Sequence, residues 1–418
     1  MTFSLSEYAN ISKIITDEQY AKEKYLNVKK ISLPNNELFI IRYNKTFLNN
    51  ENIHTLGLFR SVIVNNEGKI LSFAPPKSMD IDKFIAETNN DPIEFSEFCE
   101  GTMINLFWNN DDWELATKGT VGARCKFFQE NTKTFRHLFL EILTEKGIEL
   151  SIFDKKYIYS FVIQHPDNRI VVPFDSMDLK LVQMYSVDEN NNISSFNTLD
   201  KLNQKIKEIF PIETPRLLHQ VLDSTDCSME EIKSKFTDLN LSWKIVGAVF
   251  TNTKTGTRTK IRNPSYEYVK KLKGNNPKIQ FQYYSLRQSN MVKEYLKFYP
   301  EKKEEFSTLR DQLHQWTGQL YQNYINCYIK KLGPLRDFPY EFRPHMFKIH
   351  RKYIEELKPM KSYVSKNVVV GYVNTLEPPR LMFVINYKLR KNIIENTQND
   401  IEQATEEIEE IEEIEDTA

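Results

Sequence analysis

Several features are missing from this sequence, and each absence excludes a class of protein. Its four cysteines are scattered, with no CxxC pair and no Cys/His group at metal-binding spacing. Neither a disulfide framework nor a zinc site is therefore predicted. Residues 1–15 lack a basic segment followed by an apolar one, which argues against a signal peptide. The longest apolar runs, such as 381–385, are far too short to span a membrane. We expect a soluble cytoplasmic protein in a reducing compartment, with no membrane partner.

Basic residues are absent from the last part of the chain. The last of them is Lys391, and residues 392–418 contain 11 acidic side chains. The remaining residues carry 56 basic and 46 acidic side chains, so this body is basic although the whole chain has a net charge of −1. A basic body suits a polyanion such as RNA, although many proteins of similar charge bind no nucleic acid. The acidic segment is low in complexity, and we expect a disordered tail.

The composition that remains is globular, with 40% hydrophobic residues in 418, enough for two or three domains. Apolar alternation bounded by turn residues predicts antiparallel strands. The expected strands are 37–43, 59–65, 69–74, 103–108, 113–119, 157–163, 178–187, 242–250 and 257–263. Together with helices at 6–28, 127–147 and beyond 200, they predict an α+β fold over residues 1–273.

The helix predictions rest on specific side chains. Gly147 fits a C′ cap at the end of 127–147, and Ser228 and Glu231 form a capping box for a later helix. The apolar stripe expected on 127–147 is Phe128, Phe135, Leu138, Phe139, Ile142 and Leu143.

The turn-rich stretch 273–278 predicts a domain boundary. The domain prediction is 1–273, a mainly helical C-terminal domain at 274–391, and the acidic tail at 392–418. Within the second domain, the pattern of 365–389 fits either strand or helix.

The most informative stretch is "EFSEFCEGTMINLFWNNDDWELATKGTVGAR", residues 94–124. It predicts a β-hairpin that is entered at Gly101, with Trp108 and Trp113 facing each other near its end. Packing of the two tryptophans is the default, and stacking on a base is the minority interpretation. Lys118 and Gly119 follow the second strand. Phe98 stands three residues before Gly101, and no lysine occupies that position.

In chain order, this hairpin and five other short motifs resemble the tRNA-repairing type of phage RNA ligase, and more widely the covalent nucleotidyltransferase superfamily. The other motifs are "LFRSVIV", "PPKSM", "YSFVIQHPDNRIVV", "IVGAV" and "TKIRN". The resemblance covers about residues 55–270, and a looser one extends to ligase-like proteins of large eukaryotic DNA viruses. It implies an ATP-grasp-like nucleotidyltransferase core of antiparallel sheets with a mostly α-helical C-terminal domain. It also implies RNA and nucleotide as partners, with ATP and Mg²⁺ as cofactors if the protein is active.

The resemblance also implies which residues face the nucleotide. Most of them are cationic, as anionic phosphates and a leaving pyrophosphate require. The positions that correspond to nucleotide- or phosphate-binding residues are Arg60, Lys77, Glu100, Gly101, Thr102, Lys118, Arg169, Lys260 and Arg262.

Three positions depart from the ligase pattern. Phe98 stands where the resemblance implies the nucleophilic lysine, and Ser160 and Val246 stand where it implies carboxylates. Ligation starts when a neutral lysine amine attacks the α-phosphate of a nucleotide, which phenylalanine cannot do. Valine offers no oxygen ligand to Mg²⁺. No catalytic nucleophile is therefore assigned, and no metal site is predicted.

Three functions remain open. The first is an RNA-ligase-like protein that engages a nucleotide or RNA ends without the usual first step. The second is a catalytically inactive pseudo-ligase, a binding or structural module, for example in a viral assembly, whose helical domain and acidic tail contact protein partners. The third is a capping or repair subunit that depends on another chain.

Four further residues have both a functional and a structural interpretation. His165 is either a replacement nucleophile or, as we favour, a hydrogen-bonding loop residue. Cys99 is either a reactive thiolate or a buried core residue, and we favour the core because its sequence neighbours are not cationic. Asp167 fits an Asx-turn, an interpretation as plausible as a phosphate role for Arg169. A basic helix surface, with RNA contact as an alternative, is expected from His345, Lys348, Arg351 and Lys352.

Overall fold

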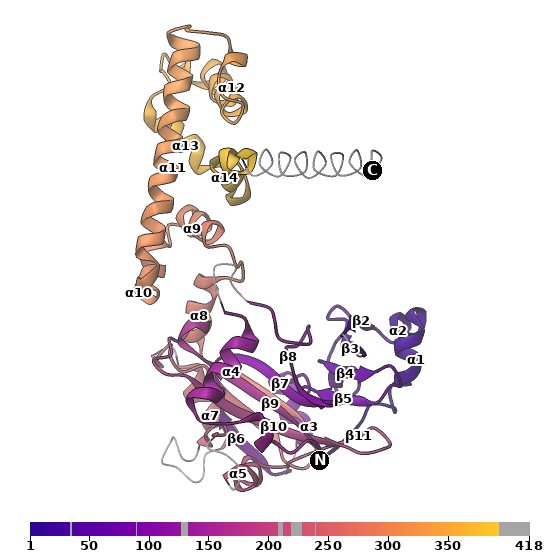
Figure 1. Cartoon of the computed structure of the whole chain (residues 1–418). Helices are drawn as coiled ribbons and strands as arrows, with labels where there is room; N and C mark the ends of the chain where they lie inside the picture. The colour runs from indigo at the N-terminus through magenta and orange to yellow at the C-terminus, as the bar shows by residue number, and fades with distance from the viewer. Residues whose placement is uncertain are drawn as a thin grey trace, which may run out of the picture. The chain divides into compact units, whose positions relative to one another are not determined.

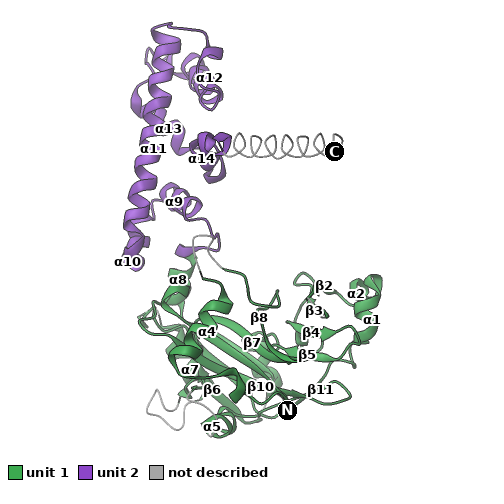
Figure 2. Cartoon of the chain, viewed as in Figure 1, with its two compact units in different colours: residues 1–271 green, residues 272–418 purple. Residues whose placement is uncertain are grey.

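The computed structural model describes residues 1–33, 36–88, 90–126, 133–207, 212–218, 228–238 and 240–392. The chain divides into two compact units, Met1–Lys271 and Leu272–Ala418 (Figure 2). Among the described residues, no helix combines the length and the apolar character that a membrane span requires.

The described part of unit 1 contains three antiparallel sheets (Figure 1). The six-stranded sheet has the order β1 (Thr2–Ser4), β11 (Asn192–Ser195), β10 (Asp178–Val187), β9 (Tyr157–Gln164), β7 (Thr102–Asn109) and β8 (Asp112–Ala116). The four-stranded sheet runs β2 (Leu26–Ser32), β3 (Glu37–Tyr43), β4 (Val62–Asn65) and β5 (Ile70–Phe73), and the three-stranded sheet runs β13 (Arg258–Arg262), β12 (Gly247–Asn252) and β6 (Ile93–Glu97). The helices are α1 (Ile11–Thr16), α2 (Glu18–Glu23), α3 (Ile81–Thr88), α4 (Phe135–Glu145), α5 (Leu199–Lys207), α7 (Met229–Thr237) and α8 (Pro264–Lys273), which crosses the boundary between the units.

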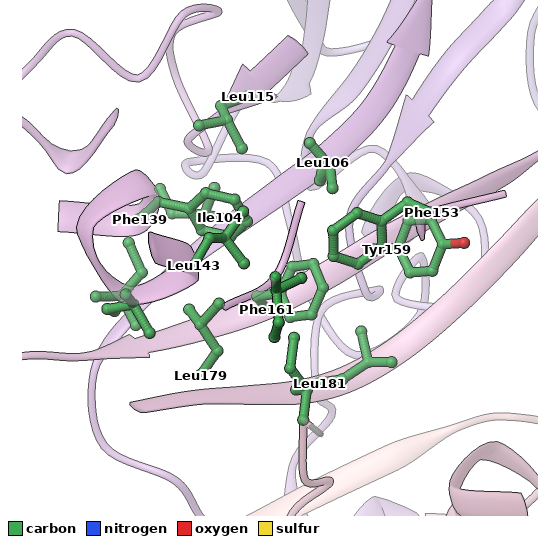
Figure 3. Close-up of a cluster of buried hydrophobic side chains, with 14 of the residues drawn as sticks. Ile104, Leu106, Leu115, Phe139, Leu143, Phe153, Tyr159, Phe161, Leu179 and Leu181 are labelled. Carbon is green, nitrogen blue, oxygen red and sulfur yellow. The ribbon is translucent and has the colours of Figure 1, made fainter. Parts of the chain in front are cut away.

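The main core lies on one face of the six-stranded sheet, where α4 and α5 cover it. Side chains alternate between the faces of a strand, so Ile104 and Leu106 of β7 point to this side together with Phe161 of β9 (Figure 3). They pack against Phe139 and Leu143 of α4. Each such side chain contributes roughly 1.5–3 kcal/mol on burial.

The opposite face of the six-stranded sheet packs on the four-stranded sheet. Phe107, Ile158 and Tyr185 point to this side and share a core with Phe59 and Phe73. The rings of Phe73 and Tyr185 meet edge to face, with their centroids 5.0 Å apart. The remaining part of this face is not covered by the four-stranded sheet, and it forms the floor of the candidate site.

The helix predicted over 6–28 is wrong. The structure has two short helices, α1 and α2, and then a strand, β2. Asp17 separates the helices, because it ends α1 and its side chain accepts a hydrogen bond from the Tyr20 amide at the start of α2. Tyr25 has a φ of 56°, which ends the helical segment, and Leu26 onwards pairs with β3 along its whole length. Tertiary pairing overrides the helical pattern here.

The helix predicted over 127–147 is confirmed only from Phe135 onwards. All five members of its predicted stripe that lie in α4 are buried, whereas Phe128 lies outside the described residues. Gly147 has a φ of 63°, as a C′ glycine requires. The capping box of Ser228 and Glu231 at the start of α7 is confirmed.

Unit 2 is helical in its described part. The segment 365–389, whose pattern fitted either strand or helix, contains two helices. Its elements are α9 (Ile279–Gln288), α10 (Val292–Phe298), α11 (Lys303–Tyr324), α12 (Arg343–Lys352), α13 (Lys366–Asn374) and α14 (Pro378–Ile385). Ser365 caps α13 and Pro378 occupies the first turn of α14, both of which favour helix starts. The tail prediction falls almost entirely outside the described residues. The predicted α+β class is confirmed.

Candidate functional site

A cavity of about 430 Å³ lies in unit 1, between the uncovered face of the six-stranded sheet and the three-stranded sheet. Met103, Val162 and Gln183 form its floor, and side chains of β6, β12 and β13 form the facing wall. Its size falls within the range of roughly 300–1,000 Å³ that is typical of small-molecule sites.

Four cations that the sequence places far apart line this cavity: Arg60, Lys77, Lys118 and Lys260. Arg60 follows a short 3-10 turn before β4, and Lys77 follows β5. Lys118 follows β8, and Lys260 lies in β13. The resemblance to RNA ligases had implied the same four positions.

Sequence reasoning missed two further cations that line the cavity, Lys45 and Arg258. Strand alternation was the signal available for Arg258, because residues 258, 260 and 262 of β13 share one face. Its guanidinium donates to the carbonyl oxygens of Pro75 and Pro76, at 3.2 and 2.8 Å from Nη2. Burial, and then the charge of Arg60, lower its pKa to about 10.

The cations of the cavity have backbone carbonyls and rings as neighbours in place of carboxylates. Arg60 donates to Pro75 O, Lys77 donates to Ser78 O, and the Lys118 Nζ lies 5.2 Å from the centroid of the Tyr43 ring. Within the described part of the chain, none of the six cations that line the cavity forms an ion pair. Burial lowers the pKa of Arg60, Lys77 and Lys118, and for both lysines the charge of Arg60 adds to this effect. The cavity therefore has an unbalanced positive charge, which favours an anion.

Among the lysines that line the cavity, Lys260 has the most strongly lowered pKa. Burial and then the nearby charges of Arg262, Lys77, Arg60 and Arg258 lower its pKa to about 7. Its side chain is exposed to solvent, so counterions moderate this shift.

The ring of Phe98 lies beside this amine. Its centroid is 5.4 Å from Lys260 Nζ and 5.5 Å from Arg262 Cζ, within the range of a cation–π contact. The Phe98 amide donates to Gly247 O, which ties the residue to the three-stranded sheet. The residue found at the implied lysine position therefore faces the cations.

The side chains of Glu100 and Thr102 accept hydrogen bonds from other parts of the protein. Glu100 Oε1 accepts from the amides of Val171 and Val172, at 2.5 and 2.9 Å. The Thr102 hydroxyl accepts from Asn168 Nδ2 at 2.9 Å. Neither residue lines the cavity; Glu100 lines a second one of about 700 Å³ that shares Phe98 with it.

The backbone conformation and the close packing at position 101 explain why this residue is a glycine. Its φ is 138°, and an added Cβ would lie 2.2 Å from Ile163 O. The remaining two predicted residues are arginines engaged by the protein itself: Arg169 Nε donates to Val171 O at 3.0 Å, and Arg262 forms an ion pair with Glu267 at 2.7 Å. These two arginines are not among the lining residues of the 430 Å³ cavity.

The residues of the cavity do not fit a protein-held metal ion. No group of three or more potential ligands from His, Cys, Asp and Glu occurs among the described residues. Two carboxylates line the cavity, and both are engaged. Glu94 accepts from the Leu199 amide, and Glu97 accepts from the Arg216 guanidinium. Burial raises the pKa of Glu94 to about 7, which makes it a weaker metal ligand still.

Ser160 and Val246 are also unsuited to catalysis. The Ser160 hydroxyl is fully buried and donates to Asn105 Oδ1 at 2.8 Å. Val246 is buried and lines the second cavity. The two positions where carboxylates were implied therefore present no free oxygen ligand.

His165, Cys99 and the pair Trp108 and Trp113 each had a functional and a structural interpretation. His165 is buried and accepts from the Asp167 amide, and burial lowers its pKa, as expected of a hydrogen-bonding residue. Burial raises the pKa of Cys99, which disfavours a thiolate. The residue is only partly buried and lines the cavity, so the prediction of a core position is too simple. Trp108 and Trp113 pair as predicted, with centroids 5.4 Å apart.

The predicted basic surface of α12 needs one correction. His345 is buried, not exposed, and its ring hydrogen-bonds the Tyr372 hydroxyl. Burial lowers its pKa to about 4, so it is neutral at pH 7. Lys348 and Arg351 are exposed.

No family model matches the chain. An RNA ligase of Rhodothermus phage RM378 is 24% identical over 206 residues, which cover 44% of this chain and 47% of that protein. Over this stretch the chain is similar to an RNA ligase, which confirms the predicted resemblance to phage RNA ligases. This chain spans about half the length of that curated relative.

Solved structures that match include a Naegleria gruberi RNA ligase with PPi (12% identity, 48% of this chain and 58% of that chain, TM-score 0.35). A putative ATP-dependent DNA ligase from Aquifex aeolicus matches over 74% and 80% of the two chains, with 16% identity and a TM-score of 0.40. An archaeal ATP-dependent RNA ligase matches over 70% and 74%, with 12% identity and a TM-score of 0.36.

Proposed function

We propose that unit 1 is an RNA-ligase-like nucleotidyltransferase-fold module that binds a nucleoside triphosphate in the 430 Å³ cavity and engages phosphorylated RNA ends. The observation that supports this proposal is the set of six cations around the cavity: Lys45, Arg60, Lys77, Lys118, Arg258 and Lys260. No carboxylate pairs with them in the described residues, so a polyphosphate is the partner that would balance their charge.

A second function, the pseudo-ligase, is favoured by a separate observation. Phe98, Ser160 and Val246 remove the amine and the carboxylates that the usual first step requires. In that case the cavity still binds a nucleotide or an RNA phosphate, but no covalent intermediate forms.

Calorimetric titration of the full chain with ATP, GTP, AMP and pyrophosphate tests the binding proposal. We expect the triphosphates to bind more tightly than AMP, with an affinity that falls as salt rises, because screening weakens charge attraction. Equal affinity for AMP and ATP, or no binding of either, would contradict a polyphosphate site.

Single substitutions locate the site. Lys118→Ala removes one cation of the cavity and should weaken ATP binding about ten- to a hundredfold, since a hydrogen bond to a charged group contributes about 1.5–3 kcal/mol. Lys155→Ala is the matched control, because Lys155 is exposed and its amine lies over the Trp108 ring, away from the cavity. An equal loss in both variants would place the site elsewhere.

RNA binding needs its own measurement. A short RNA with a 5′-phosphate and the same RNA with a 5′-hydroxyl are compared by fluorescence anisotropy at several salt concentrations. Tighter binding of the phosphorylated end, lost in Lys118→Ala, is expected. Joining of pre-adenylated RNA would favour the ligase over the pseudo-ligase.

A further inference from the structure

The amine of Lys260 lies where strand pairing brings it to the vacant lysine position. Lys260 in β13 is paired with Val249 in β12, and Val249 is paired with Ser96 in β6. Phe98 follows directly after β6, and the Lys260 Nζ lies 5.4 Å from its ring centroid. An amine therefore lies within one side-chain length of the residue that replaces the expected nucleophile.

The surroundings of this amine favour its neutral form. The charged and titratable groups that face it or line the same cavity are Arg60, Lys77, Arg258, Arg262, Lys45, Lys118, Glu94, Glu97, Cys99, Tyr43 and Tyr185. Partial burial and the cations among them, which outnumber the carboxylates, lower the pKa of Lys260 to about 7, while its side chain remains exposed to solvent. A lysine whose pKa is lowered beside other cationic groups is a competent nucleophile at neutral pH.

The other lysines of the cavity suit this role less well. Lys77 Nζ donates to Ser78 O at 2.9 Å, and Lys118 Nζ lies over the Tyr43 ring. For neither of them does the pKa fall as far as for Lys260. In the described part of the chain, Lys260 forms no hydrogen bond or ion pair through its amine, which contacts the ring of Phe98. Its lone pair is therefore available to a substrate in the cavity.

We propose that Lys260 is the nucleophile of a relocated nucleotidyl-transfer site, an inference that rests on the proposed binding of a nucleoside triphosphate. The neutral Nζ attacks the α-phosphorus and a P–N bond forms. The bond from that phosphorus to the α–β bridging oxygen breaks, and pyrophosphate leaves with the electron pair. The attacking amine loses one proton to solvent, so the product is a phosphoramidate of Lys260. The step needs no oxidant or reductant.

The test uses the full chain with α-³²P-labelled ATP or GTP, in buffer with Mg²⁺ or Mn²⁺, followed by a denaturing gel and peptide mass spectrometry. The expected result is a label that is lost in acid, resists base and maps to Lys260. Its rate should rise with pH through about 7, as the amine loses its proton.

Lys260→Arg keeps the positive charge but removes the nucleophile, and it should abolish the label. Lys155→Arg, at an exposed position outside the cavity, should label normally. Calorimetry with ATP on the same preparations shows whether each variant still folds and binds. Bound ATP without a label in the unaltered chain, or a label that maps to another residue or survives Lys260→Arg, would overturn the inference while leaving the proposed function intact. Absence of ATP binding in the unaltered chain would overturn both.

Discussion

Glu100 offers the sharpest test of how this site is built. Its buried carboxylate accepts the amides of Val171 and Val172, and it thereby fixes the segment after β9 to the entrance of the β7–β8 hairpin. Glu100→Ala leaves both amides without this acceptor. A hydrogen bond to a charged group contributes about 1.5–3 kcal/mol, so the two together predict a loss of about 3–6 kcal/mol.

Hydrogen exchange measured by mass spectrometry on peptides that span 166–175 is the appropriate assay, because it reports the local opening of this segment. The expected loss corresponds to exchange that is about a hundred- to ten-thousandfold faster at Val171 and Val172. Glu100→Gln keeps an acceptor without the charge and should lose about half as much, since charge-assisted bonds are about twice as strong as neutral ones.

The control is Glu37→Ala, which breaks the ion pair of Glu37 with Lys30. Both of these side chains are about half exposed, and such pairs contribute about 0–1 kcal/mol. If exchange in 166–175 is unchanged in Glu100→Ala, or rises equally in the control, the structural role assigned to Glu100 is refuted.

Three further predictions concern stability. In Gly247→Ala the new Cβ would lie 1.9 Å from Ile261 O, so urea denaturation should show a loss of about 3 kcal/mol or more. Gly147→Ala, where φ is also positive but the space is open, should lose only about 1–2 kcal/mol, and equal losses would contradict the steric argument. His345 has a folded-state pKa of about 4 against an ordinary 6.5, so the unfolded chain takes up its proton first as pH falls. Stability should therefore drop by about 3 kcal/mol between pH 6.5 and 4, and His345→Asn should flatten that drop; an unchanged pH dependence would show that another group causes it. Ser228→Ala should cost about 1 kcal/mol through loss of the α7 cap, and no change in urea denaturation would show that the capping box contributes nothing.

Local pattern predicted much of unit 1. The strands at 37–43 and 178–187 have the predicted bounds, because the alternation of apolar residues indicates which face of a strand is buried. The helix at 6–28 failed, because neither the pairing of β2 with β3 nor the break at Asp17 is visible as a change in hydrophobic period. The paired positions of Trp108 and Trp113 follow from the length of the hairpin loop.

The candidate site was only partly predictable. The resemblance to RNA ligases implied Arg60, Lys77, Lys118 and Lys260, and the structure places all four around one cavity. It also implied Glu100 and Arg169, whose side chains are hydrogen-bonded to the backbone near Val171. Lys45 and Arg258 were missed, although Arg258 alternates with Lys260 along the predicted strand.

The sequence by itself determined which chemical groups this chain possesses. It excludes an amine at position 98 and carboxylates at 160 and 246, and it makes the body basic. The tertiary structure decided which groups meet. Two antiparallel pairings, β13 with β12 and β12 with β6, carry Lys260 to Phe98 across more than 150 residues of chain. Such a contact depends on long-range strand register and on burial shared by many residues, and no local pattern encodes either. The lowered pKa of Lys260 has partly the same origin: its first cause is burial, and of the cations that add to it, Lys77 and Arg60 come from distant parts of the chain.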